Sequence, residues 1–329
     1  MKKIMNDPNT VVKEMLEGLV AAHPEHLKLI EGTTVITRTE RKNGKVALIS
    51  GGGSGHEPAH GGFVGRGMLD AAVSGEVFTS PTPDQIIEGI KAIDNGCGVL
   101  MIIKNYTGDV MNFEMAAELA EIEGIQVKQV IVNDDVAVEN STYTTGRRGI
   151  AGTIFVHKIA GALAEKGGSL DEVQRVAQKV IDHVKSMGIA LTPCTIPAAG
   201  KPGFELADHE MEIGMGIHGE PGIYRSGIKS AAEIAELLLD KVLPELNLTE
   251  HDKVALLING LGATPLMELY ILNREVNKRL TDKNIHIYKT YVGEYMTSIE
   301  MAGCSLSLLK LDDELIELLD AEAETLGWK

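Results

Sequence analysis

Short apolar segments alternate with amphipathic segments along most of this chain, and that alternation limits the folds it can adopt. Segments 46–49 and 254–258 are continuous apolar runs, typical of strands buried on both faces. Elsewhere apolar residues recur every three or four positions, as at Ile86, Ile90 and Ile93, which is the spacing of one helical face. Strands alternating with helices predict the α/β class, with each sheet mixed or mostly parallel and flanked by helices.

Length and composition agree with this class and indicate two domains. Hydrophobic residues make up 44% of the 329 residues, aromatic residues only 4%, and 36 residues are glycine, a mixture that suits tight turns between strands and helices. A chain of this length exceeds one ordinary domain of roughly 150 residues. Because the pattern restarts near Met187, the predicted domains are an N-terminal one, 1–185, and a C-terminal one, 186–329.

Local signals predict where several elements begin. The Ser-x-x-Glu sequences that start at Ser169 and Ser230 have the form of capping boxes, so a helix is expected after each serine. Asn43-Gly44 is a typical hairpin turn, and it lies between the strand-like segments 35–38 and 46–49. These two strands are therefore expected to pair with each other.

Net charge, the N-terminal sequence and the cysteines restrict the partners, the location and the metal sites of this chain. The net charge of −16 argues against nucleic acid or an anionic membrane, because both require clustered lysine and arginine. The N-terminus becomes polar at Asn6-Asp7, without an apolar signal sequence, so a cytoplasmic location is expected. The cysteines Cys97, Cys194 and Cys304 are far apart and provide neither a disulfide framework nor a paired-cysteine metal site.

A glycine-rich segment, 51–55, directly follows the first apolar strand and precedes His56. Glycines let backbone N–H groups approach a ligand closely, so a small polar ligand is expected here. The dinucleotide pattern G-x-G-x-x-G and the nucleophile pattern G-x-S-x-G both fail, because His56 stands where each requires glycine. The sequence contains no Walker phosphate loop. Nucleotide binding by this chain is therefore not predicted.

The next residues, from His56 to His60, match the zinc protease pattern H-E-x-x-H. That pattern requires a helix, whereas here it follows glycines and contains Pro58, which fits only a first helical turn. A zinc hydrolase using His56 and His60 remains an alternative, as does a plain turn histidine. The favoured interpretation is that His56 faces a substrate, with no metal bound.

Three segments at predicted strand ends carry reactive side chains: 53–56, 104–109 and 218–222. Ligands bind at the carboxyl ends of strands in open α/β sheets, so these segments are expected to converge. Lys104 and Asp109 taken alone fit a solvated pair better than a site. In contrast, the imidazole of His218 stands in a tight glycine turn and could act as base, ligand or nucleophile. The other histidines, His157 among them, are expected to be surface or packing residues.

Four ordered sequence patterns resemble the dihydroxyacetone kinase family, in particular the substrate-binding part of its bacterial phosphoenolpyruvate-dependent branch. The resemblance covers essentially the whole chain. The patterns are Gly51-Gly52-Gly53-Ser54-Gly55-His56-Glu57-Pro58, Lys104-Asn105-Tyr106-Thr107-Gly108-Asp109, Arg147-Arg148-Gly149-Ile150-Ala151-Gly152 and Gly214-Met215-Gly216-Ile217-His218-Gly219-Glu220-Pro221-Gly222.

The resemblance implies roles for the reactive residues. His218 would add through a ring nitrogen to the ketone carbon of dihydroxyacetone and hold it as a hemiaminal, which glycerol cannot form. Asp109 would be the base for the attacking hydroxyl, and His56 would hydrogen-bond the substrate and assist as general acid or base. These three residues are the expected catalytic residues.

The same resemblance implies a set of substrate-binding residues. Gly53, within the sequence Gly53-Ser54-Gly55, and Lys104 would bind the substrate's oxygens together with His56 and Asp109. Ser80 would line the pocket.

It also implies partners. No cofactor would bind to this chain, and ADP or ATP with Mg²⁺ would be carried by a second, nucleotide-binding kinase subunit. A phosphohistidine carrier of the sugar phosphotransferase system would recharge that subunit, and the chain would form a homodimer. The alternative is a paralogue that binds dihydroxyacetone and activates a transcription regulator without phosphorylation. The presence of His56 and Asp109 favours the enzyme.

Overall fold

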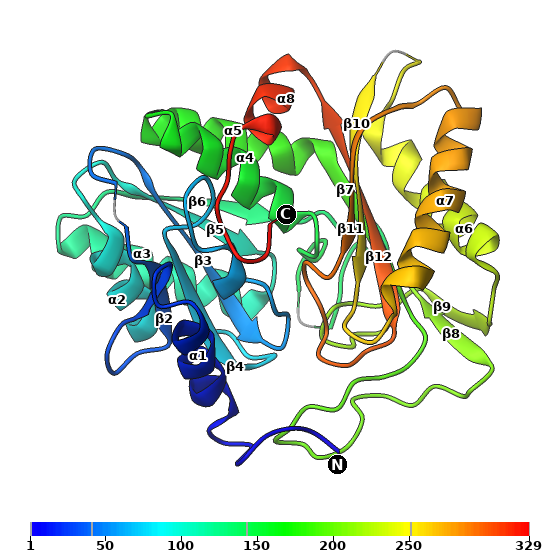
Figure 1. Cartoon of the computed structure of the whole chain (residues 1–329), viewed down its shortest axis with the longest axis horizontal. Helices are drawn as coiled ribbons and strands as arrows, with labels where there is room; N and C mark the ends of the chain where they lie inside the picture. The colour runs from blue at the N-terminus through cyan, green and yellow to red at the C-terminus, as the bar shows by residue number, and fades with distance from the viewer. Residues whose placement is uncertain (1, 41, 143, 251, 329) are drawn as a thin grey trace.

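The computed structural model describes residues 2–40, 42–142, 144–250 and 252–328. In these residues the chain forms two six-stranded sheets with helices on their faces (Figure 1). The first sheet uses the first six strands of the chain and the second sheet uses the next six. The predicted α/β class is confirmed.

The first sheet is mostly parallel. Its strands are β1 Leu27–Leu29, β2 Val35–Arg38, β3 Ala47–Ser54, β4 Ala71–Val77, β5 Val99–Lys104 and β6 Val127–Val132. They lie in the order β1-β2-β4-β3-β5-β6. Strands β4, β3, β5 and β6 run parallel, whereas β1 and β2 form an antiparallel edge. The carboxyl ends of β3 and β5 therefore meet at one edge, as the sequence predicted for the segments that follow them.

The second sheet is mostly antiparallel. Its strands are β7 Val184–Ala190, β8 Glu210–Ile213, β9 Tyr224–Gly227, β10 Lys253–Gly260, β11 His286–Gly293 and β12 Gly303–Leu311. They lie in the order β11-β10-β12-β7-β8-β9. Strand β11 runs parallel to β10, and the other neighbouring pairs are antiparallel.

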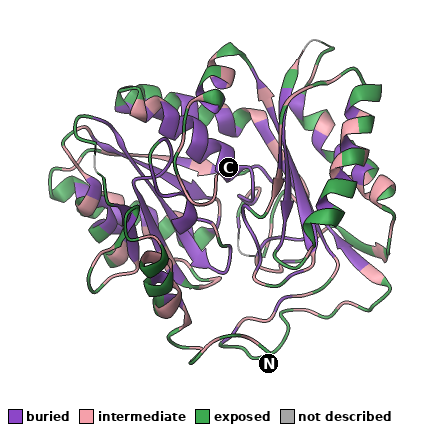
Figure 2. Ribbon diagram, in the orientation of Figure 1, coloured by how far each residue is buried: buried purple, intermediate pink, exposed green. Residues whose placement is uncertain are grey.

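The helices form layers around and between the sheets. They are α1 Val11–Ala22, α2 Pro83–Ile93, α3 Thr107–Ile122, α4 Thr153–Glu165, α5 Leu170–His183, α6 Ala231–Leu246, α7 Leu266–Asp282 and α8 Asp313–Asp320. Helices α2 and α3 cover one face of the first sheet, and α4 and α5 cover the other. Helices α6 and α7 pack on the second sheet, while α5 also reaches β12 from the opposite side. The buried strands and the inner helices form the core (Figure 2).

The predicted hairpin between 35–38 and 46–49 is wrong. Strand β2 pairs antiparallel with β4, and β3 lies on the far side of β4. All eight residues of β3 are buried, and it pairs on one edge with β4 and on the other with β5. A strand in the middle of a sheet needs two partners, so this long-range pairing overrides the local turn signal at Asn43-Gly44.

The glycine-rich segment, 51–55, was expected to follow the first apolar strand, but most of it belongs to that strand. Strand β3 continues through Ser54, and neighbouring backbone comes too close for side chains. A Cβ at Gly51 would lie 2.4 Å from the carbonyl oxygen of Val73, and one at Gly53 would lie 2.5 Å from the backbone nitrogen of Thr79. Glycine is therefore required by the close approach of β4 and the segment after it.

Both predicted capping boxes are present. The Ser169 and Ser230 hydroxyls each accept a hydrogen bond from the backbone three residues later, at the start of α5 and of α6. The division at 185/186 stays a prediction, since each sheet lies mostly on one side of it but β7 begins at Val184. Among the described helices, none is long and apolar enough to cross a membrane.

Candidate active site

His218 lies in a turn between β8 and β9, with its ring held by three aromatic rings. Strand β8 ends at Ile213, and the chain then turns through Gly214 to Gly222. The ring centroids of Tyr106, His56 and Phe78 lie 4.5, 4.8 and 5.2 Å from that of His218, and all three rings are nearly perpendicular to it. Only 15% of the His218 side chain is exposed, so the ring has little freedom to turn.

One nitrogen of His218 is already occupied. Its Nδ1–H donates to Oε1 of Glu220 over 2.9 Å. Burial acts to raise the pKa of the Glu220 carboxyl, but the neighbouring His218 and Arg148 outweigh burial and lower this pKa to about 2. Glu220 is therefore an ionised acceptor, and Nε2 of His218 is the ring atom left for a substrate.

His56 is fully buried beside His218 and presents an unbonded nitrogen. Its Nδ1–H donates to the carbonyl oxygen of Thr297 over 2.7 Å, and its Nε2 has no hydrogen-bond partner among the described residues. Burial, with smaller contributions from His218 and Lys104, holds the pKa of His56 well below its usual range. The ring is thus neutral, with a lone pair on Nε2 that can accept a hydrogen bond.

Lys104 and Asp109 lie together under the glycine strand and do not form a solvated pair. Lys104 is the last residue of β5, Asp109 is in the first turn of α3, and both are buried. A Cβ at Gly52 would lie 2.6 Å from Nζ of Lys104 and 3.5 Å from Oδ2 of Asp109. Burial lowers the pKa of Lys104, and Asp109 partly opposes that shift. The bare backbone of Gly52 leaves room for both charged groups at the pocket.

A buried pair of histidines supports Lys104. Its Nζ lies 2.8 Å from Nε2 of His60, and Nδ1 of His60 lies 3.0 Å from Nε2 of His157 on α4. Burial and the nearby Lys104 lower the pKa of His157 to about 3. His157 is thus a buried residue with a specific partner, which the sequence did not indicate because 97 residues separate it from His60.

The zinc protease pattern does not form the helix that it requires. Residues 57–60 form turns, and a 3-10 helix follows at Gly61–Phe63. His56 bonds Thr297, whereas His60 bonds Lys104 and His157. The two rings therefore make hydrogen bonds to different residues and do not face one common site. In the described part of the chain, no group of three or more His, Cys, Asp or Glu side chains could hold a metal ion.

The remaining predicted binding residues lie on the segments that surround these side chains. A Cβ at Gly108 would lie 2.8 Å from Oγ of Ser80, so Ser80 contacts the first turn of α3 next to Asp109. The Ser54 hydroxyl donates to the carbonyl of Gly75 over 2.7 Å and is therefore engaged within the sheet. The Gly55 carbonyl accepts from the backbone of Ile299 over 2.7 Å, which joins β3 to the segment after β11.

The three reactive segments therefore converge, as the sequence predicted, where the two sheets meet. His56 follows β3, Lys104 ends β5, and His218 comes from the second sheet. Glu220 and Thr297 were not predicted as site residues, and His60 was named only as a zinc ligand in the hydrolase alternative. Glu220 had a weak sequence signal, since it stands two residues after His218 in the same glycine turn.

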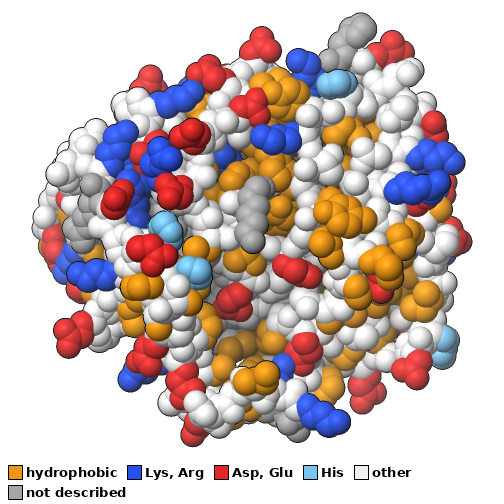
Figure 3. Space-filling model, in the orientation of Figure 1, with side chains coloured by type: hydrophobic (Ala, Val, Ile, Leu, Met, Phe, Trp, Pro, Cys, Tyr) orange, Lys and Arg blue, Asp and Glu red, His pale blue; other side chains and the backbone are white. Residues whose placement is uncertain are grey.

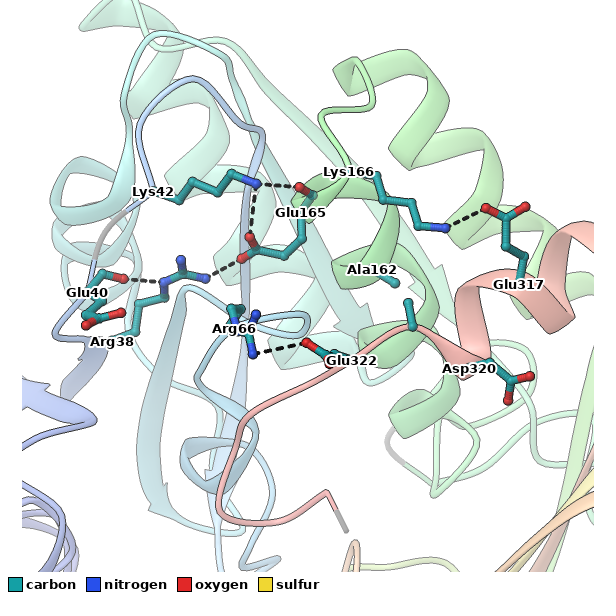
Figure 4. Close-up of a pocket in the computed structure, with 11 residues that line it drawn as sticks. Arg38, Glu40, Lys42, Arg66, Ala162, Glu165, Lys166, Glu317, Asp320 and Glu322 are labelled. Carbon is teal, nitrogen blue, oxygen red and sulfur yellow. Dashed lines mark hydrogen bonds and ion pairs between the residues drawn. The ribbon is translucent and has the colours of Figure 1, made fainter.

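A separate basin of about 850 Å³ lies between the first sheet and α4 and α8 (Figure 4). Its charged side chains are paired with one another: Arg38 and Lys42 contact Glu165, and Lys166 contacts Glu317. Paired charges leave little capacity to bind a further ion. This basin contains none of the predicted site residues.

Comparison with known proteins identifies the family. Residues 17–327 match the Dak1 domain. The chain belongs to the Dak1 family. This Dak1 chain is 57% identical over 329 residues to the "PTS-dependent dihydroxyacetone kinase 1, dihydroxyacetone-binding subunit DhaK" of Listeria innocua, with 100% of both chains covered. The resemblance to the dihydroxyacetone kinase family is confirmed.

Two solved structures are similar to the whole Dak1 chain. The dihydroxyacetone kinase operon co-activator Dha-DhaQ has a TM-score of 0.91 and 38% identity, with 96% of this chain and 97% of that chain covered. The dihydroxyacetone kinase of C. freundii, solved in complex with AMP-PNP and Mg²⁺, has a TM-score of 0.92 and 38% identity. There the match covers 99% of this chain and 60% of that one.

Gly52→Ala tests whether the glycine strand makes room for Lys104. The new Cβ would lie 2.6 Å from Nζ, so the flexible lysine end has to shift from its place beside His60, and the φ of +158° at Gly52 adds backbone strain. We expect turnover to fall about 100-fold, the effect of a misplaced reacting group, while the fold persists.

The matched control is Gly18→Ala on α1, where a Cβ has no atom within 4 Å. It should leave turnover unchanged and raise stability by up to about 1 kcal/mol, because alanine favours helix. Thermal unfolding and phosphorylation assays on both variants provide the check. Normal turnover in Gly52→Ala would contradict the packing argument.

Proposed function

We propose that this Dak1 chain is a dihydroxyacetone-binding subunit of a dihydroxyacetone kinase, and that it presents the bound substrate for phosphorylation. The observation that carries the proposal is the placement of His218, whose bond from Nδ1 to Glu220 leaves Nε2 for a substrate, beside His56, whose Nε2 has no partner among the described residues. Full-length identity of 57% to a subunit with that name supports it.

His218 is proposed to bind the substrate covalently. The lone pair on Nε2 attacks the ketone carbon, the C=O π pair moves to oxygen, and that oxygen takes up a proton from solvent. The ring then carries positive charge until its Nδ1 proton passes to solvent, which returns the proton that oxygen took up and leaves a neutral hemiaminal. Glycerol has no electrophilic carbon and is excluded, so the addition step provides specificity.

The other residues are proposed to hold and activate the hydroxyl that is phosphorylated. Asp109 accepts the proton as that hydroxyl attacks phosphorus, which is general base catalysis. His56 bonds Thr297 through Nδ1–H, so its Nε2 accepts a hydrogen bond from a substrate hydroxyl. Lys104 and the backbone at Gly53 bind the substrate's oxygens, with Ser80 at the wall.

The phosphoryl donor is proposed to come from a second chain. A relative that this chain matches over 100% of both lengths is named as one subunit of a kinase, the dihydroxyacetone-binding one, and the sequence contains no phosphate loop. We infer that ADP or ATP with Mg²⁺ is held by a nucleotide-binding kinase subunit, which a phosphohistidine carrier of the phosphotransferase system recharges. The residues of the dihydroxyacetone-binding chain then position the substrate hydroxyl for in-line transfer of the phosphoryl group. We propose that these reactions take place in the cytoplasm.

A second candidate function is a dihydroxyacetone-sensing co-activator, which the TM-score of 0.91 to Dha-DhaQ favours. The two functions separate in a reconstituted assay. This chain is mixed with a nucleotide-binding kinase subunit and ATP. If it is the dihydroxyacetone-binding subunit, the amount of dihydroxyacetone phosphate formed should rise in proportion to the concentration of this chain. Binding of dihydroxyacetone without any phosphorylated product would favour the co-activator.

We also propose that the chain forms a homodimer. Large apolar side chains are exposed around β9 and along α7, and in Figure 3 they gather on the side of the molecule where α7 lies. They are Ile223, Tyr224, Ile228, Leu266, Met267, Tyr270 and Ile271. Exposed apolar patches of this kind mark protein interfaces. Light scattering after size-exclusion chromatography should give twice the 35.3 kDa chain mass, and Met267→Glu with Tyr270→Glu should give the monomer mass.

A further inference from the structure

Glu220 is bound on both of its oxygens by the same residue, His218. Its Oε1 accepts from the ring Nδ1–H, and its Oε2 accepts from the backbone N–H, each over 2.9 Å. The Glu220 side chain is completely buried. A ring rotation about Cβ–Cγ or a loss of the Nδ1 proton would break the first of these bonds, so the carboxylate selects one ring orientation and one tautomer.

The turn is built around this carboxylate. A Cβ at Gly216 would lie 2.1 Å from Oε2 of Glu220 and 2.6 Å from Nη1 of Arg148, so the two charged groups occupy the space of a missing side chain. Arg148 is anchored by Asp135 over 2.7 Å and by the carbonyl of Gly214 over 2.8 Å. Its Nη1 has no hydrogen-bond partner among the described residues and lies next to Glu220 as a buried cation. This arrangement keeps a buried carboxylate ionised.

We propose that Glu220 is a positioning residue that keeps the proton of His218 on Nδ1 and thereby presents the Nε2 lone pair to the substrate carbonyl. The proposal rests on the proposed function, since it assigns a task in the addition step. When Nε2 bonds to the ketone carbon, the ring carries positive charge with Nδ1 still protonated. Glu220 is then the adjacent countercharge, so it stabilises the charged state more than the free ring.

Glu220→Gln is the sharpest variant, because it keeps the shape of the side chain. A carboxylate accepts twice, whereas an amide accepts once and donates from its other end. If the amide oxygen faces the ring, the amide N–H opposes the backbone N–H of His218. If the amide turns round, its N–H needs a lone pair on Nδ1 and favours the Nε2–H tautomer, which is unable to attack.

The first measurement is ¹⁵N NMR of the histidine rings in the full chain without substrate, with His218→Ala to assign the signal. The wild-type ring should be protonated on Nδ1, and Glu220→Gln should shift the population toward Nε2–H. The second measurement is the rate at which dihydroxyacetone adds, which should fall about 100-fold in Glu220→Gln. Glu205→Gln, at an exposed position in the loop before β8, is the control and should change neither.

Four results are decisive. Glu220→Ala should lose the tautomer preference while retaining the wild-type circular dichroism, which separates positioning from folding. A wild-type His218 protonated on Nε2 would overturn the proposal. So would a Glu220→Gln variant with unchanged tautomer and unchanged addition rate. A wild-type ring protonated on Nδ1 that never adds dihydroxyacetone would refute covalent capture and still support the tautomer assignment.

Discussion

His218→Ala is expected to abolish retention of dihydroxyacetone by the chain. Nε2 of His218 is the nucleophile in our account, and alanine has no atom that can bond to the ketone carbon. Native mass spectrometry of the wild-type chain should show one added dihydroxyacetone per chain, and the variant should show none. Turnover with the partner subunit should fall by at least about 100-fold, because the substrate is no longer held in place.

The control for this variant is His209→Ala, an exposed histidine in the loop before β8. It should bind one dihydroxyacetone as the wild type does. Thermal unfolding should show that His218→Ala is folded, since the side chain that is lost is partly exposed. An adduct that persists in His218→Ala would refute the assignment of His218 as the nucleophile.

Asp109→Asn is expected to separate binding from phosphoryl transfer. The amide occupies the same volume beside Lys104 and Gly52, so the pocket should keep its shape and the adduct should still form. It has no basic oxygen to take the proton of the attacking hydroxyl, and general base catalysis typically contributes about 10²- to 10⁴-fold. Turnover should fall by that factor while the adduct remains visible by mass spectrometry.

Glu114→Gln is the matched control, because Glu114 lies exposed on the same helix, α3. It should leave both adduct and turnover unchanged. If Asp109→Asn turned over normally, another group would have to be the base. If it lost the adduct as well, Asp109 would act in binding and not in the transfer step.

The sequence predicted much of the fold because local patterns and core burial agree. The apolar runs 46–49 and 254–258 lie in β3 and β10, and the serines at 169 and 230 became helix caps. The hairpin failed because a buried central strand needs partners on both sides, and no local pattern reveals which distant strand provides them. The prediction that the glycines follow the strand was wrong for a similar reason, since the need for glycine comes from the close approach of β4 and the segment after it.

The site was predictable where reactive residues follow strands that meet at one edge. His56, Lys104 and Asp109 belong to that group. His56 lies against His218, and Lys104 and Asp109 both lie beside Gly52. The residues that orient them were not predictable. Thr297 binds His56 through a backbone carbonyl, which any residue has, and His157 reaches His60 only through the packing of α4. Contacts of this kind depend on tertiary structure alone.

We propose that dihydroxyacetone is held through a covalent bond to His218. The most direct measurement is ¹³C NMR of dihydroxyacetone labelled at its ketone carbon and added to the full chain. The bound signal should leave the carbonyl region and appear where tetrahedral carbons bonded to oxygen and nitrogen resonate, and His218→Ala should lack this signal. A bound signal that stays in the carbonyl region would contradict this proposal.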